Sequence, residues 1–253
     1  MSEQEQAKEF VPGEGPGMVQ NGLVRGIPGE QIAVNGVLDL RGVPVEAFAP
    51  VKTVVVNGVV LLDEINRGAL AKVSTVVNGT ITVADASLRL LVQPEVEITK
   101  TMVEAMPAGQ KLMVVGIVYV HQDVPAAVLA EKIEQLTTVG ILIAPEAVHG
   151  ALFGKLESTG VAIALRDDSG TVVRCVGDNR WDAGYLSHLD DGSAYVNVGN
   201  TTIAADLPEE LVAQKIAAYY NVGATTGPEA ILSLLRSRCS VNMGAFNTPE
   251  EAD

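Results

Sequence analysis

The chain has 253 residues, of which 47% are apolar, only 4% aromatic and 19% charged, and its net charge is -14. A mean hydropathy of +0.26 excludes a mostly disordered chain, because there is ample apolar surface to bury. The excess of acidic residues, without clusters of Lys and Arg, argues against nucleic acid or an anionic membrane as a partner.

Residues 1–30 are expected to form a flexible arm, which includes a run rich in glycine and proline at 11–17. Asn21-Gly22 is a possible start of a capping repeat at the end of this arm. The start of the chain has neither the basic residues nor the apolar segment of a secretory signal. The longest apolar stretches are too short to cross a bilayer, which takes about 20 residues. We therefore expect a soluble, cytoplasmic protein without a membrane partner.

A short β-branched run followed by a glycine recurs nine times along the rest of the chain. The glycines lie 20 to 24 residues apart except at two gaps of 37 and 39 residues, and they are Gly36, Gly58, Gly79, Gly116, Gly140, Gly160, Gly199, Gly223 and Gly244. Corresponding members of the three triplets are 80 to 84 residues apart, which indicates three large units. The predicted domains are the arm at 1–30, a repeat region at 31–247 with units 31–111, 112–194 and 195–247, and an acidic tail at 248–253.

Each repeat has the pattern of a strand followed by a short helix. Residues 54–62 are a continuous apolar run, which is typical of a buried strand in a parallel sheet. Residues 206–218 begin with an acceptor side chain, a proline and acids, and continue with helical apolar spacing. Such a unit cannot bury its own apolar face, so its neighbours must stack on it. The predicted fold is an α/β solenoid of about nine strand–helix repeats of 20–24 residues with a parallel sheet, arranged as three units of about 80 residues.

The two long gaps contain extra segments with strand composition. Residues 88–92 with 96–98, and residues 171–176, are expected to form hairpins that project from the stack. The second gap leads into a segment, 178–192, that holds the only tryptophan. Its candidate interaction residues are Asp178, Arg180, Trp181, Tyr185 and His188. Two interpretations are open: a recognition site, or an amphipathic cover in which Trp181 packs on the sheet.

Asparagine recurs beside the repeat glycines. Asn35, Asn57 and Asn78 immediately precede a glycine, so stacked repeats would place their amides within hydrogen-bonding reach. In the last unit the asparagine moves one position earlier, to Asn197, Asn221 and Asn242. A shift by one residue exchanges the two faces of a strand, so the two ends of the molecule should present different surfaces. The ladders either serve binding or assembly, or only hold the turns.

The 20- to 24-residue units with a recurring asparagine resemble leucine-rich-repeat proteins over residues 32–243. The nearest match to the family motif is Leu-x-x-Val-x-Thr-x-x-Asn at residues 70–78, and the other units depart further from it. The resemblance implies a right-handed solenoid used for protein contacts. Some bacterial proteins with Val-Asn-Gly units are similar as well, and that likeness implies no activity.

Motifs that carry chemistry are missing from the sequence, among them a nucleophile elbow, a phosphate-binding loop, a zinc-binding helix and a Cys-x-x-Cys pair. The histidines His121, His149 and His188 fall in different repeats at dissimilar positions, which disfavours a shared metal site. Cys175 and Cys239 are interpreted as small packed side chains. We therefore predict no catalytic, cofactor-binding or metal-binding residues, and no enzyme.

The predicted function is structural or interactive, because a solenoid exposes a strand edge at each end and neither terminal segment has the composition of a cap. The expected partner is the protein itself, in a homo-oligomer or filament. Two alternatives are a monomeric scaffold that binds another protein, and a small-ligand-binding protein or enzyme with its site in residues 178–192.

Overall fold

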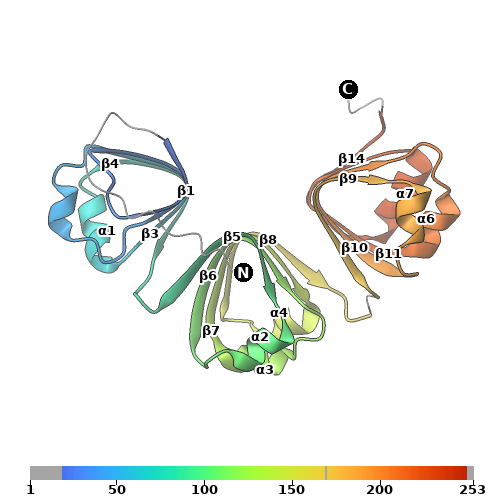
Figure 1. The fold of residues 1–253 in the computed structure, drawn as a ribbon, viewed down its shortest axis with the longest axis horizontal. Coiled ribbons are helices and arrows are strands. Elements are labelled where there is room, and N and C mark those ends of the chain that lie inside the picture. The colour runs from blue at the N-terminus through green and yellow to red at the C-terminus, as the bar shows by residue number, and fades with distance from the viewer. Residues whose placement is uncertain (1–18, 169, 250–253) are drawn as a thin grey trace, which may run out of the picture.

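The fold is described from a computed structural model that covers residues 19–168 and 170–249. Its strands form three separate parallel sheets, and each sheet with its helices makes one lobe of an arch (Figure 1). The N-terminal lobe contains β1 (Val19–Arg25), β2 (Gln31–Asp39), η1 (Val45–Phe48), β3 (Thr53–Leu62), α1 (Glu64–Leu70) and β4 (Ser74–Val83). Its strands pair in chain order, β1-β2-β3-β4.

The other two lobes repeat this plan. The middle lobe contains β5 (Leu88–Ile98), α2 (Lys100–Ala105), β6 (Gln110–Val120), α3 (Ala126–Lys132), β7 (Ile133–Pro145), α4 (Glu146–Ala151) and β8 (Leu156–Leu165). The C-terminal lobe contains β9 (Val172–Trp181), α5 (Ala183–Ser187), β10 (Ser193–Ile203), α6 (Glu209–Lys215), β11 (Ile216–Asn221), β12 (Ala224–Thr226), α7 (Glu229–Arg238), β13 (Cys239–Asn242) and β14 (Ala245–Asn247). Here β11 with β12, and β13 with β14, each form one broken layer, so every lobe has four layers.

The α/β class and the parallel sheets predicted from the sequence are confirmed, whereas the single stack of nine repeats is not what the structure has. The segments at the two long glycine gaps are not hairpins: they are β5 and β9, each of which starts a new sheet. The sheets therefore separate at 84–87 and 166–171, earlier than the predicted unit boundaries. β1 lies inside the predicted arm, while residues 1–18 and 250–253 lie outside the described residues.

Most of the long strands bend at a glycine, and at several of these glycines the neighbouring strand leaves no room for a side chain. Gly58 has a φ of +142°, and a Cβ built on it would lie 2.0 Å from the carbonyl oxygen of Gly36 in the neighbouring strand. Positive φ is accessible mainly to glycine, and the close approach leaves no room for a side chain. The bend divides the strand into a first arm and a second arm. In each lobe the bends face the concave side of the arch and the helices lie on its convex side (Figure 1).

The arms and helices of each lobe enclose an apolar core of their own. The helical layer is tied together by basic side chains that donate to the last carbonyl oxygens of the preceding helix or turn. Lys155 Nζ donates to the carbonyl oxygens of Ala130 and Ile133 at 2.7 and 3.1 Å, and Lys215 Nζ donates to that of Leu189 at 2.9 Å. These bonds satisfy carbonyls that a short helix leaves unpaired.

The second arm of one lobe packs on the first arm of the next. Val37 and Leu61 of the N-terminal lobe share an apolar cluster with Leu88 and Met113 of the middle lobe. A second cluster joins the middle and C-terminal lobes and contains Ile117, Tyr119, Ile143, Ile163, Leu165, Ala194, Val196 and Tyr220. The arch is thus held by buried apolar contacts between lobes as well as within them. Within the described ranges, no helix is long and apolar enough to cross a membrane.

Candidate functional site

The three sheets leave strands at both ends that pair on one side only. We call β1, β5 and β9 the leading strands, and β4, β8 and the layer of β13 and β14 the trailing strands. The strands that meet where two lobes pack indicate that the leading strands lie toward one face of the arch and the trailing strands toward the other. Contacts between lobes keep this order. Arg174 in β9 bonds Glu97 in β5, and the Arg166 amide after β8 donates to the Tyr220 hydroxyl in β11.

Exposed apolar side chains gather on these end layers. Nine large apolar side chains are exposed among the described residues, and six of them belong to leading or trailing layers. The six are Leu23 in β1, Val76, Ile81 and Val83 in β4, Val176 in β9 and Met243 between β13 and β14. An unpaired strand edge with apolar side chains is a typical surface for pairing with another chain.

β4 is the least protected of the end strands. Its ten residues, Ser-Thr-Val-Val-Asn-Gly-Thr-Ile-Thr-Val, include no charge and no proline, and its register with β3 is unbroken. By contrast, β5 carries Pro94 at an irregularity in its pairing, β8 carries Glu157, and β9 carries the exposed charges Asp178 and Arg180. Charges, prolines and bulges are the usual means by which natural proteins block an edge strand. β4 therefore lacks the protection that β5, β8 and β9 have.

The core of the N-terminal lobe is open at β4. Ile81 and Val83 lie in register with Val60 and Leu62 of β3, which are fully buried core residues. Because no further strand covers them, Ile81 is 51% exposed and Val83 is 36% exposed. Core positions of this lobe are therefore exposed to solvent at its trailing end.

An outer asparagine ladder runs along the first arms of the N-terminal lobe. Its side-chain amides donate in sequence from Asn78 to Asn57 at 2.7 Å, from Asn57 to Asn35 at 2.8 Å and from Asn35 to Asn21 at 3.3 Å. All four side chains are exposed. Asn21 had no part in the predicted ladder, although Asn21-Gly22 repeats the Asn-Gly signal.

An inner ladder occupies the C-terminal lobe. The Asn197 amide donates to Asn221 Oδ1 at 2.9 Å, and the Asn221 amide donates to Asn242 Oδ1 at 3.0 Å. Asn197 and Asn221 are fully buried, and their amides also reach the carbonyl oxygens of Ala224 and Ala245, where the strands are interrupted. This ladder replaces backbone bonds that the broken layers cannot make.

The position of a lobe in the arch explains why asparagine changes face. Val115 and Val139 precede the glycines at the bends of the middle lobe, and they pack toward the N-terminal lobe. In the C-terminal lobe, Val198 and Val222 hold the same position and pack on the middle lobe. Among the described residues no lobe packs on the first arms of the N-terminal lobe, so the same position faces solvent there and is asparagine. The surface of asparagines is therefore a free lateral face of the arch.

The candidate interaction residues of 178–192 do not converge. Trp181 is fully buried in the C-terminal core, which agrees with the cover interpretation, whereas Asp178 and Arg180 are exposed on the outer side of β9. Asp178 accepts a bond from Asn200 at 2.8 Å on the second free lateral face. Tyr185 is half-buried in α5 and His188 is exposed after that helix.

Trp181 is part of an aromatic cluster that includes Tyr195 and Tyr219. The Trp181 ring meets Tyr195 edge-on at 4.8 Å between centroids, and Tyr195 stacks on Tyr219 at 5.9 Å. Burial raises the pKa of Tyr219 to about 12, and it raises the pKa of Tyr195 as well. Hydroxyls that stay protonated in an apolar core hold the lobe together and offer no base for catalysis.

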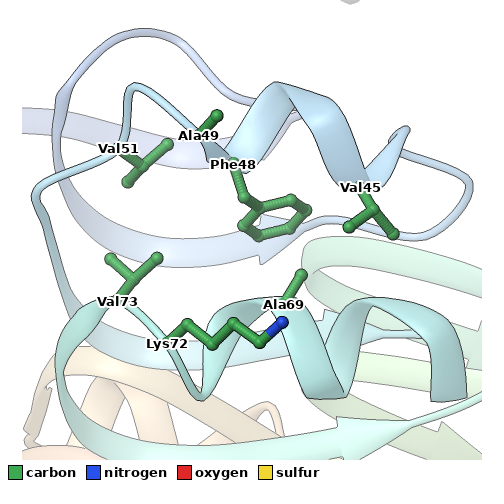
Figure 2. A pocket seen from close by; sticks show the side chains of 7 residues that line it. All are labelled: Val45, Phe48, Ala49, Val51, Ala69, Lys72 and Val73. Carbon is green, nitrogen blue, oxygen red and sulfur yellow. The ribbon is translucent and has the colours of Figure 1, made fainter.

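A shallow apolar groove lies on the helical side of the N-terminal lobe, between η1 and α1 (Figure 2). It has a volume of about 290 Å³, with Val45 and Phe48 on one wall and Ala69, Lys72 and Val73 on the other. Its one charged lining residue, Lys72, gives the groove little means of selecting a ligand.

Three comparisons give this chain no relative: protein-family models, curated proteins and solved structures all lack a match. Within the ranges that the structure covers, no three His, Cys, Asp or Glu side chains are grouped as metal ligands. His121 lies 3.2 Å from Glu97 at the lobe interface, while His149 contacts the Ile163 carbonyl oxygen. The end strands and the two asparagine ladders are therefore the candidate functional features of this chain.

Proposed function

We propose that this chain is a structural protein whose lobes act as three short solenoids, and that it assembles with copies of itself through the ends of its sheets. The observation that carries the proposal is the gathering of six of the nine exposed large apolar side chains on the end layers. Unpaired backbone groups beside apolar side chains are costly in water and are satisfied when another strand adds.

The free lateral faces support an axial rather than a sideways contact. The N-terminal lobe presents its asparagine ladder there, and the C-terminal lobe presents Asp178, Arg180 and Asn200. These polar columns replace the valines and isoleucines that join one lobe to the next inside the arch. These polar side chains offer another lobe fewer apolar contacts than the valines and isoleucines inside the arch do.

The proposal is tested by measuring the mass of the purified protein over a wide concentration range with light scattering coupled to size exclusion, together with negative-stain microscopy. We expect the mass to rise with concentration and stacked particles to appear. A monomer at the highest attainable concentration would contradict self-assembly and would favour a monomeric scaffold that binds another protein.

A further inference from the structure

We infer that β4 of one copy pairs with β1 of the next copy, parallel and in register, so that copies add head to tail. This inference rests on the proposed self-assembly and specifies its contact. The new interface would repeat the pairing that already joins β3 to β4, in which all ten residues of β4 are in register. The partner that fits an unfinished parallel sheet of this kind is another copy of its own first layer.

The side-chain columns match across such a contact. Val24 of β1 belongs to the same core column as Leu38, Val60 and Ile81, as the successive strand registers show. Placing β1 on β4 would set Val24 beside Ile81 and close the open core. The one charged residue of β1, Arg25, would lie beside Thr82 at the end of the contact.

The outer ladder has complementary ends. Each amide donates toward the N-terminal end of the lobe, so Asn78 keeps Oδ1 as an acceptor, and Asn21 keeps its amide as a donor. In a head-to-tail contact the Asn21 amide of one copy would donate to Asn78 Oδ1 of another, and the ladder would continue with the same polarity. Two β4 strands facing each other would instead bring together two ends of the same kind.

The glycine column also continues. Within the lobe, the glycine at each bend lies against the carbonyl oxygen of the bend glycine in the preceding strand, as Gly79 lies against that of Gly58. Among the described residues, nothing lies within 4 Å of the place where a Cβ on Gly22 would be, which leaves room for the Gly79 carbonyl oxygen of another copy. A leading strand with a side chain at this position could not approach as closely.

One movement brings all three lobes into place. Since every lobe has four layers, a shift of about 19 Å along the stacking direction, four strand spacings, would set each leading strand beside a trailing one. Pro94 and Glu157 make the middle lobe a weaker contact, so β4 dominates. Because this contact joins two different surfaces by a shift without a rotation that closes a ring, repeating it gives a filament.

The first test compares two substitutions that add the same charge to exposed isoleucines. Ile81→Lys places a lysine on the β4 edge, whereas Ile65→Lys places one on α1, where Ile65 is 71% exposed. We expect Ile81→Lys to shift the concentration of half-assembly upward at least tenfold, and Ile65→Lys to leave it unchanged. Both variants should keep the thermal midpoint of the wild-type monomer, since neither side chain is enclosed.

The second test uses cysteine pairs in a background where Cys175 and Cys239 are replaced by Ala. In the proposed contact the Cα atoms of Asn21 and Asn78 are neighbours across two strands, within the range that a disulfide spans. An equimolar mixture of Asn21→Cys and Asn78→Cys proteins should form a disulfide-linked dimer under mild oxidation, and neither protein alone should. The double variant should give a ladder of multimers.

The outcomes separate the two proposals. If the wild type assembles but Ile81→Lys has no effect and the mixture does not cross-link, the β4–β1 contact is wrong and self-assembly stands. A dimer from Asn78→Cys alone would show two β4 edges facing each other, which also overturns the contact. A wild type that stays monomeric overturns both proposals.

Discussion

Tyr219 illustrates how a single buried side chain ties stability to pH. Its hydroxyl lies 2.8 Å from Thr225 Oγ1 in a fully buried environment, and burial raises its pKa from 10.0 to about 12. The folded chain therefore keeps the phenol proton over a range in which the unfolded chain releases it. Its contribution is fully present below pH 10 and is lost as the pH rises toward 12.

We expect the free energy of unfolding to fall between pH 9 and pH 11 by roughly 1 kcal/mol more in the wild type than in Tyr219→Phe. Urea unfolding followed by circular dichroism at the two pH values measures the difference. Tyr195 titrates in the same direction and is present in both proteins, so it contributes equally. Equal pH slopes for the two proteins would contradict the burial of the Tyr219 hydroxyl.

At the residue scale the sequence predicted which asparagine positions line up across the strands, but not whether these side chains are buried or exposed. The shift of asparagine by one position indicated a change of face, and Asn57 is exposed whereas Asn221 is buried. Which of the two faces is buried depends on whether another lobe packs there, and that is a property of the arch. The exposure of Ile81 was not predicted, because residues 74–83 have the apolar pattern of a strand that is paired on both sides. The lack of charged residues in this segment was the available signal that it could pair with another strand.

At the scale of elements, the bent strand is the repeating part, and its bend depends on glycine. The glycine count located most strands but missed the leading ones. β1 bends at Gly22, in the predicted arm where Asn21-Gly22 was a possible start of a capping repeat. β9 bends at Gly177, directly after the segment 171–176 that was interpreted as a hairpin, and β5 has Gln93 and Pro94 at its bend. A leading strand has no preceding strand that would require glycine, so its signature is weaker.

Gly58→Ala tests the bend. The new Cβ would meet the Gly36 carbonyl oxygen at 2.0 Å, and alanine would also have to adopt a φ of +142°. We expect the free energy of unfolding to fall by about 3 kcal/mol or more. Chemical denaturation of the purified variant provides the measurement.

The matched control is Gly68→Ala in α1, where a Cβ meets nothing within 4 Å and φ is not positive. This variant should gain about 0.5–1 kcal/mol, because alanine is the better helix former. A similar loss in both variants would contradict a special requirement for glycine at the bend, because the effect of alanine on the unfolded chain is stabilising.

At the scale of the whole molecule, the lobes are joined by a polar clasp beside the apolar clusters. The Arg174 guanidinium lies 3.8 Å from the centre of the Tyr119 ring and binds Glu95 and Glu97, while its side chain is only 19% exposed. These contacts link β9 to two strands of the middle lobe. Removing the guanidinium would leave carboxylates and a ring face without their partner.

We expect Arg174→Ala to lower the free energy of unfolding by about 2–3 kcal/mol, and Arg174→Lys to recover less than half of this, because lysine lacks the planar fork. Arg166→Ala is the control. Arg166 pairs with Asp168 where the two side chains are 60% and 69% exposed, so its loss should cost less than about 1 kcal/mol. Equal effects at the two positions would argue against the clasp.

The stacking of layers also has a consequence for how the chain folds. Asparagines that bond across neighbouring layers are 14 to 24 residues apart, so each strand pairs with one made shortly before or after it. Contacts between residues that are near in the chain favour fast folding. Parallel sheets usually have few such contacts and therefore fold slowly. Each strand thus pairs with a layer that lies next to it in the chain. β4 is the last strand of its lobe, and its outer edge stays unpaired because the next strand in the chain, β5, begins the sheet of the middle lobe.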